Sequence, residues 1–246
     1  MSRAFGNVYE DEGRARAYAT LQFPGTYYLA YRDLPSLVRH YGCGTRALDF
    51  GCGTGRSTRF LRDLRFEVTG LDISQAMLDQ ARSLDPAGDY RLVGDGGVLD
   101  GFAPDSFGVI LAAFTFDNIP TDAAKADALR RLRTLLAPDG ALFLVVSSPA
   151  IYVNEWVSFS TKNFPENREA RDGDRVRIVM LDVPDRRPVE DVLCTDANYR
   201  RLFENASLEV REVRSPLATG QETTRWVSET ITAPWTIYVL SRLTNR

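Results

Sequence analysis

Hydrophobic and polar positions follow two different periods along the chain from about Thr45 onward. Short runs that are mostly apolar predict strands, and segments with an apolar residue at every third or fourth position predict helices. Strands that alternate with helices predict a mostly parallel sheet with helices on both faces. The predicted strands cover 45–50, 67–72, 89–94, 107–114, 141–146, 208–213 and 235–240, and the predicted helices cover 34–41, 56–64, a segment opening at Ser74, another opening at Pro120, and 196–206.

Two of the runs, 107–114 and 141–146, are apolar at almost every position, which is typical of central strands buried on both faces. The alternation breaks at residues 149–194, which are aromatic at first and strongly charged afterwards. Within that stretch, 175–181 and 189–194 flank a proline-containing turn and are expected to form a hairpin. The sequence therefore predicts an α/β, doubly wound fold with an inserted cap after the fifth strand.

The composition narrows the class of partner. The 246 residues can bury one sizeable core, and a formal net charge of −3 with a sequence pI near 5.4 disfavours an electrostatic nucleic-acid binder. A small-molecule partner is favoured, and we expect a monomer or a homodimer.

The three cysteines, Cys43, Cys52 and Cys194, show neither the CxxC spacing of a metal site nor the even number of a disulfide framework. We therefore expect no metal and a reducing, cytoplasmic location. Residues 1–16 are polar and lack the apolar core of a signal peptide. No apolar run approaches the roughly 20 residues that span a bilayer, so membrane insertion is not expected.

A glycine-rich loop, Asp49-Phe50-Gly51-Cys52-Gly53-Thr54-Gly55, follows the first predicted strand. Glycine permits the sharp turn from strand to helix and lets a ligand lie against bare backbone. Asp72 and Asp95 follow the second and third strands, and a carboxylate in the position of Asp72 can accept hydrogen bonds from ribose hydroxyls. Because the carboxyl ends of parallel strands share one edge of a sheet, these acids are expected to converge on one crevice.

The glycine loop resembles the first motif of class I S-adenosylmethionine (SAM)-dependent methyltransferases, an acidic residue followed two positions later by G-C-G-x-G. The resemblance implies a Rossmann-like fold with an antiparallel last strand, and an enzyme that transfers a methyl group from SAM to a small-molecule acceptor and releases S-adenosylhomocysteine (SAH). It implies that the loop lines the methionine part of SAM and that Asp72 binds the ribose. The cofactor-binding residues expected on this basis are Asp49, Gly51, Cys52, Gly53, Gly55, Asp72, Ile73, Asp95, Gly96, Ala113 and Phe114.

On the same basis the chain is divided into an N-terminal helical lid at 1–44, a SAM-binding core at 45–148, the cap at 149–194 and a C-terminal completion of the sheet at 195–246. Substrate contacts are expected from the lid, the fourth-strand exit and the variable segments. The candidates are Tyr27, Tyr28, Phe116, Asp117, Asn118, Tyr152, Trp156 and Trp226. An ordinary packing role is the alternative for each, and Asp117 and Asn118 could equally only begin the next helix.

Methyl transfer is an in-line displacement, so the protein must mainly align the reactants and exclude water. His40, the only histidine, falls on a predicted helix where a structural role is favoured, and we assign no catalytic residue. Three alternatives stay open: a non-catalytic SAM-binding module, an RNA methyltransferase disfavoured by the charge, and an NAD-dependent oxidoreductase. Against the last, Arg56 stands where the dinucleotide fingerprint has glycine or alanine.

Overall fold

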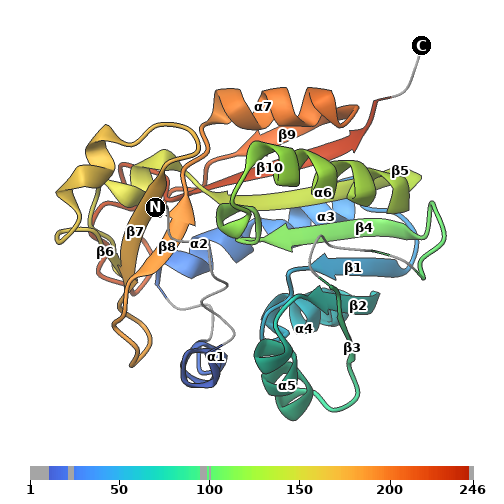
Figure 1. The fold of residues 1–246 in the computed structure, drawn as a ribbon, viewed down its shortest axis with the longest axis horizontal. Helices are drawn as coiled ribbons and strands as arrows, with labels where there is room; N and C mark the ends of the chain where they lie inside the picture. Colours follow the sequence, from blue (N-terminus) through green and yellow to red (C-terminus); the bar gives the residue numbers. More distant parts are fainter. Residues whose placement is uncertain (1–10, 22–24, 95–98, 100, 244–246) are drawn as a thin grey trace.

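Seven strands form one sheet in the computed structural model, which describes residues 11–21, 25–94, 99 and 101–243. The strands lie in the order β3, β2, β1, β4, β5, β10, β9 (Figure 1). Neighbours among β1 to β5 are parallel, whereas β10 runs antiparallel to both β5 and β9, which confirms the predicted fold class. The bounds are β1 Arg46–Phe50, β2 Glu67–Asp72, β3 Asp89–Leu92, β4 Phe107–Ala113, β5 Leu136–Ser147, β9 Leu208–Arg214 and β10 Trp235–Arg242.

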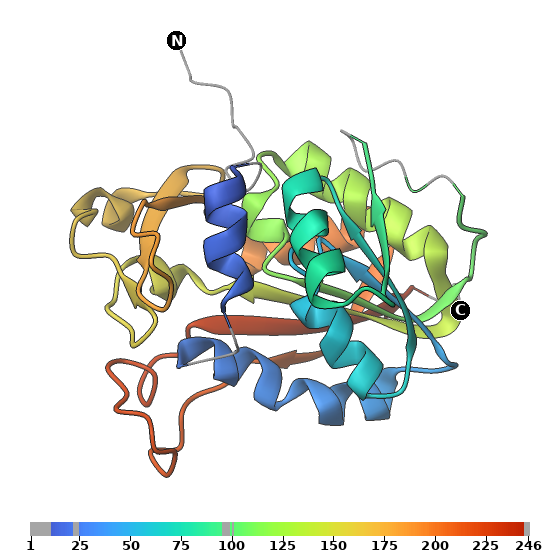
Figure 2. The same cartoon turned by 90° about the horizontal axis from the view of Figure 1, so that it is seen from below.

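Helices cover both faces of this sheet, and each face has its own apolar core. One core joins α2, α3 and α4 to the sheet, and the other joins α6 and α7 to the opposite face. Figure 2 shows α2 and α3 on one side of β10 and α6 on the other. No helix in the described ranges has the length and apolarity to cross a membrane. The bounds are α2 Thr26–Arg32, α3 Leu34–Tyr41, α4 Arg56–Asp63, α5 Gln75–Leu84, α6 Asp122–Leu135 and α7 Asp196–Asn205.

Side-chain caps set where three of the helices begin. The hydroxyl oxygens of Ser74, Thr121 and Thr195 accept hydrogen bonds from the backbone N–H three residues later, at 3.2, 3.2 and 3.3 Å. Each cap satisfies a donor that the first turn of α5, α6 or α7 would otherwise leave unpaired. The helix start predicted at Ser74 is confirmed, and Ser74 is the N-cap of α5.

Strand β5 begins earlier than the sequence predicted. Leu136 already pairs with Phe107, and the ladder resumes when Ala141 pairs with Val109. Residues 137–140, which contain Pro138 and Gly140, therefore form an irregularity within the strand. A bulge of this kind accommodates residues that a regular ladder would exclude.

The segment after β5 forms a small sheet in the order β6, β7, β8. Strands β7 and β8 pair antiparallel, which confirms the predicted hairpin. One face of the hairpin carries Val176, Ile178, Met180 and Val189, which are buried in the same core as α2 and α3. Figure 1 shows this cap beyond the carboxyl end of β4. The bounds are β6 Phe159–Ser160, β7 Arg175–Met180, β8 Val189–Val192, and the 3-10 turns η2 Phe116–Asn118, η3 Pro149–Tyr152 and η4 Pro165–Glu169.

Candidate active site

A cavity of about 710 Å³ lies at the carboxyl ends of β1, β2 and β4 and continues under the cap, and its volume is typical of small-molecule sites. We call its two parts the glycine-loop half and the cap half. In the part of the chain that the structure describes, no cluster of histidine, cysteine or carboxylate side chains is arranged to hold a metal ion. The glycine-loop half is lined by Gly51, Gly53, Leu71, Asp72, Ile73 and Met77, and the cap half by Tyr27, Phe114, Asp117, Ile151, Phe159, Ile178, Met180, Val189, Asp191 and Trp235.

Two positions of the loop require glycine, because each has a left-handed backbone and leaves no space for a Cβ atom. Gly51 has φ 74°, and a Cβ atom there would lie 2.2 Å from Oγ1 of Thr115. Gly55 has φ 77°, and a Cβ atom there would lie 2.4 Å from the hydroxyl oxygen of Tyr90. Side chains disfavour this left-handed backbone even without such clashes. Gly51 lines the cavity and Gly55 does not, so Gly55 serves the packing of α4 near β3.

Replacing Gly51 by alanine is expected to lower the free energy of unfolding by about 2–4 kcal/mol, because strain at φ 74° is added to the clash with Thr115. Urea unfolding measures the loss. Gly173→Ala is the matched control, because Gly173 has φ 88° but no atom within 4 Å of its added Cβ, and it should cost only about 1 kcal/mol. Equal losses in the two variants would contradict the role given to Thr115.

The carboxylate of Asp72 ends β2 and lines the glycine-loop half. Its Oδ2 accepts a hydrogen bond from the N–H of Gly53 at 2.7 Å, and its Oδ1 accepts one from the N–H of Ser74 at 2.8 Å. Burial raises the pKa of Asp72, and these two backbone donors oppose the shift. Because each carboxylate oxygen can accept more than one hydrogen bond, the fixed carboxylate can still receive hydroxyl groups of a ligand.

Asp49 is fully buried beneath the glycine loop and does not line the cavity. Its Oδ2 accepts hydrogen bonds from the hydroxyls of Ser57 at 2.7 Å and Thr58 at 2.6 Å. Its Oδ1 has no hydrogen-bond partner among the described residues. Burial raises the pKa of Asp49 to about 6, although the two hydroxyls oppose the shift. The side chain therefore joins β1 to the start of α4 and keeps one oxygen for a further partner.

Asp49 predicts a particular dependence of stability on pH. Its pKa in the folded protein, about 6, lies above the ordinary 3.8, so its contribution to stability is fully present below pH 3.8 and is lost as the pH rises to 6. The loss amounts to about 2–3 kcal/mol. Asp49→Asn cannot ionise, so it should gain that amount relative to the wild type between pH 4 and pH 7 in urea unfolding.

The control for this measurement is Asp63→Asn, the same substitution at an exposed position of α4. Its curve of unfolding free energy against pH should run parallel to that of the wild type. A difference between wild type and Asp49→Asn that stays constant over the whole pH range would contradict the raised pKa.

The remaining cofactor-binding candidates fall into three groups. Ile73, Ala113 and Phe114 line the cavity. The side chain of Cys52 does not, because it packs in a small core with Leu78, Ala81 and Tyr90, and the backbone N–H of Cys52 donates to the carbonyl of Leu71 at 2.8 Å. Asp95 and Gly96 lie outside the described residues.

Three of the expected substrate contacts, Tyr27, Asp117 and Asn118, line the cavity. Asp117 and Asn118 do not cap the next helix, since Thr121 does so. They lie in the short turn η2, which places Asp117 under the cap. There its carboxylate accepts a hydrogen bond from the N–H of Ser147 at 3.0 Å.

The structure does not place the other five substrate candidates at the cavity. Tyr28 is 41% exposed on α2, and Phe116 packs in the core beside Phe50. The other three are aromatic residues whose polar atoms are already bonded within the protein. These are Tyr152, which donates to Asp191, Trp156, which donates to the carbonyl of Ile151, and Trp226, which donates to Glu222.

Two residues that the sequence did not single out complete the cap half. Trp235 begins β10, and Asp191 lies on β8 directly opposite Val176. Asp191 is thus the charged exception on the apolar face of the hairpin, and it is only 8% exposed. The signal is present in Val189-Glu190-Asp191-Val192, but it becomes visible only when the pairing shows which residues face inward.

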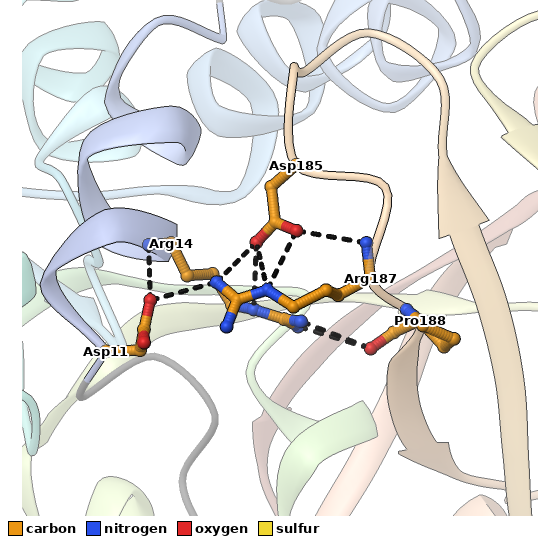
Figure 3. Close-up of polar contacts among 5 residues, drawn as sticks. All are labelled: Asp11, Arg14, Asp185, Arg187 and Pro188. Atoms are coloured by element: carbon orange, nitrogen blue, oxygen red, sulfur yellow. Dashed lines mark hydrogen bonds and ion pairs between the residues drawn. The ribbon is translucent and has the colours of Figure 1, made fainter.

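Helix α1 (Glu12–Ala19) contacts both α5, on the glycine-loop side, and the loop between β7 and β8 of the cap. It packs against α5, and its Tyr18 lines the cavity. Figure 3 shows Arg14 reaching the loop between β7 and β8, where it pairs with Asp185 at 3.4 Å and donates to the carbonyl of Pro188 at 3.3 Å. From the same loop, Arg187 pairs with Asp11, the N-cap of α1, at 2.9 Å.

Arg56 is buried at the start of α4. Its guanidinium lies 5.5, 5.1 and 5.9 Å from the ring centroids of Tyr18, Tyr27 and Tyr31. In the dinucleotide fingerprint a glycine or alanine occupies this position so that helix and strand can pack closely. A long side chain packed against three tyrosines opposes the NAD-dependent alternative.

Comparisons with known proteins match the central part of the chain. A family model described as a methyltransferase domain matches residues 48–144. The malonyl-[acyl-carrier protein] O-methyltransferase of Enterobacter lignolyticus is 34% identical over 103 residues, which are 39% of this chain and 37% of that protein. The 18S rRNA (guanine-N(7))-methyltransferase of Bos taurus is 45% identical over 60 residues, which are 24% of this chain and 21% of that protein. These matches span little more than a third of the relatives at most, so they do not identify an acceptor.

Solved structures match most of the chain. The CcbJ methyltransferase from Streptomyces caelestis aligns with a TM-score of 0.62 at 18% identity, over 90% of this chain and 100% of that one. A SAM-dependent methyltransferase from Mesorhizobium loti aligns with a TM-score of 0.59 at 20% identity, over 85% of this chain and 97% of that one. The matched domain contains the glycine loop and Asp72. Residues 48–144 therefore match the methyltransferase domain family, and the chain has the fold of SAM-dependent methyltransferases.

Proposed function

We propose that this protein transfers a methyl group from SAM to a small-molecule acceptor. The observation that carries the proposal is the single cavity in which the carboxylate of Asp72 and the backbone of Gly51 and Gly53 continue into a separate, mostly apolar cap half. Such an arrangement provides one place for a cofactor and an adjoining place for an acceptor.

The residues of the glycine-loop half fit SAM. Asp72 would accept hydrogen bonds from the ribose hydroxyls, and Ile73 would pack against the adenine, with Asp95 and Gly96 as further candidates. SAM carries a sulfonium and an ammonium group, and the carboxylate of Asp49, which is buried beneath the glycine loop, would favour charge of that sign in this region through its negative charge. When bound, SAM supplies a methyl carbon that its positive sulfur activates for displacement.

The protein's own part in the reaction would be alignment and exclusion of water. Ala113 and Phe114, at the end of β4, line the cavity, and Phe114 is held in a left-handed conformation with φ 62° while its N–H donates to the carbonyl of Val145 at 2.8 Å. A fixed backbone at this point can position an acceptor against the methyl group. The apolar cap face would keep water from the reacting atoms.

A small acceptor is favoured over RNA by the charge of the cavity. Among the described residues, its lining includes Asp72, Asp117, Asp127, Glu190 and Asp191 but only one basic residue, Arg131, which pairs with Asp127 at 2.6 Å. Phosphate groups would be repelled by such a lining. The cap also narrows the space above the strand ends to a volume suited to small molecules.

Calorimetric titration of the purified protein with SAH tests the proposal, with NADH as the parallel ligand. We expect a dissociation constant in the range of about 1–100 μM for SAH and no binding of NADH. A folded protein that binds neither SAH nor SAM, or that binds NADH instead, would refute the proposed function.

A further inference from the structure

The cap half contains two buried carboxylates that face the same space. Asp117 comes from η2, Asp191 comes from β8, and these two elements pack against each other. Both residues line the cavity, and they are 4% and 8% exposed. The Oδ2 of Asp191 accepts a hydrogen bond from the hydroxyl of Tyr152 at 3.1 Å, whereas its Oδ1 receives none from any described residue. One nearly buried carboxylate oxygen is therefore left for whatever occupies the cavity.

Four aromatic rings form the wall beside these carboxylates. Tyr27 lies 5.6, 5.0 and 5.7 Å from Phe114, Phe159 and Trp235, measured between ring centroids, and all four residues line the cavity. Trp235 pairs across the sheet with Ser147, and the N–H of Ser147 is the donor to Asp117. The aromatic wall and the carboxylates are therefore adjacent.

The charges around the carboxylates leave them without a matched cation. Among the described residues no basic side chain pairs with Asp117 or Asp191, although buried Lys125 is near enough to stabilise the charge of both. Lys125 is 1% exposed, and its ammonium has no hydrogen-bond partner in the described part of the chain and lies 5.8 Å from the ring centroid of Tyr199. Glu190, the third acid here, pairs with Arg175 at 3.0 Å. With both aspartates ionised, two negative charges against one positive charge leave a net charge of −1.

We propose that Asp117 and Asp191 bind the ammonium group of a small amine whose aromatic or apolar body packs against Tyr27, Phe159 and Trp235, and that this amine is the methyl acceptor. The inference rests on the proposed function for the identity of the reaction, but the amine site itself rests on the cavity. Aromatic faces and carboxylates both attract a cation, and both are present on adjoining walls. A carboxylate or phosphate acceptor would add a second unmatched negative charge, and an alcohol would leave the first one uncompensated.

The chemistry of this step balances. One carboxylate, Asp191 in our proposal, takes a proton from the ammonium and leaves a neutral amine. The nitrogen lone pair then forms a bond to the methyl carbon while the electron pair of the carbon–sulfur bond stays on sulfur. The products are a methylammonium ion and SAH, and the carboxylic acid returns its proton to water. Burial raises the pKa of Asp117 to about 6 and that of Asp191 well above its ordinary value, which favours proton acceptance, while Lys125 opposes both shifts.

The test is binding of three probes that share a benzyl or phenyl body, measured by calorimetry with the protein saturated with SAH. The probes are benzyltrimethylammonium, which has a permanent positive charge, benzyl alcohol and benzoate. We expect the cation to bind at least about tenfold more tightly than the alcohol, and benzoate to bind most weakly. Equal binding of cation and alcohol, or a preference for benzoate, would overturn the inference.

Asp191→Asn removes the charge and keeps an oxygen that can accept from Tyr152, so its preference for the cation should fall below about threefold. Glu166→Gln is the matched control, because Glu166 is an exposed cap carboxylate that pairs with Arg177, and it should keep the wild-type preference. A preference that survives in Asp191→Asn would refute the role of this carboxylate. If Asp191→Asn does not fold, the comparison of probes on the wild type still decides.

Titration with SAH, followed by titration of the three probes both with and without added SAH, separates this inference from the proposed function. If SAH binds and the cation is not preferred, the amine inference fails and the proposed function stands. If the cation is preferred by protein to which SAH does not bind, the cavity holds an amine site and the proposed function fails.

Discussion

Alanine at position 229 is expected to lower the free energy of unfolding by about 3–5 kcal/mol, the largest loss that we expect from a single substitution. The carboxylate of Glu229 is fully buried. Its Oε1 accepts hydrogen bonds from the hydroxyl of Thr26 at 2.6 Å and the N–H of Val157 at 2.8 Å. Its Oε2 accepts from the N–H groups of Val227 at 2.9 Å and Ser228 at 3.0 Å. Truncation would leave four donors without an acceptor.

Glu229 also connects segments that are far apart in the chain, so its removal is expected to weaken the contact between them as well as the four hydrogen bonds. Thr26 begins α2 and Val157 lies in the cap, so one side chain joins the N-terminal helices to the cap and to the loop before β10. Urea unfolding measures the effect. Glu204→Ala, an exposed glutamate on α7, is the control and should change stability by less than about 0.5 kcal/mol. Should Glu229→Ala cost under about 1 kcal/mol, the four donors would have found other partners.

Removing the carboxylate of Asp72 is expected to weaken SAH binding by about 10- to 100-fold, or 1–3 kcal/mol. Two effects add. The ribose hydroxyls lose their acceptor, and the N–H groups of Gly53 and Ser74 lose the bonds that fix the loop. Calorimetry of Asp72→Ala measures the change, and urea unfolding of the same variant reports how much of the fold is affected.

Two further variants separate these effects. Asp72→Asn keeps one carbonyl oxygen as an acceptor, so it should lose less affinity than Asp72→Ala. Asp79→Ala removes an exposed carboxylate from α5 and should bind SAH as the wild type does. SAH affinity that is unchanged in Asp72→Ala would exclude this carboxylate from the cofactor site.

The fold could be predicted because its signals are local. The period of apolar positions located every strand of the large sheet, and the serine before Gln75 marked a helix start. The glycine-loop half of the cavity could be predicted for the same reason, since the glycine loop and Asp72 each lie at the end of one strand. Cys52 shows the limit of that reasoning, because neighbours in a tight turn point in different directions.

The cap side could not be predicted because its signals are non-local. Whether Trp156 or Trp235 faces the cavity depends on contacts between segments far apart in the chain, and aromatic composition is the same in either case. Asp191 became recognisable only through its pairing opposite Val176. Glu229 carries no sequence signal at all, since its four donors come from three separate segments.

The cap half of the cavity has one wall from α2, η2 and β10, outside the insertion, and one wall that belongs to the insertion. Tyr27, Asp117 and Trp235 form the first, and Phe159, Met180 and Asp191 form the second. The insertion leaves the sheet at Ser148, whose N–H donates to the carbonyl of Pro234 at 2.9 Å, and it rejoins at Thr195, the N-cap of α7. Ser148 and Thr195 are therefore two fixed positions between which one insertion can be exchanged for another. Under the proposed function, a transplanted insertion that keeps the contacts of Val157 with Glu229 and of Asp185 with Arg14 would change the acceptor side while the glycine-loop half is retained, which makes the scaffold suited to chimeric enzymes.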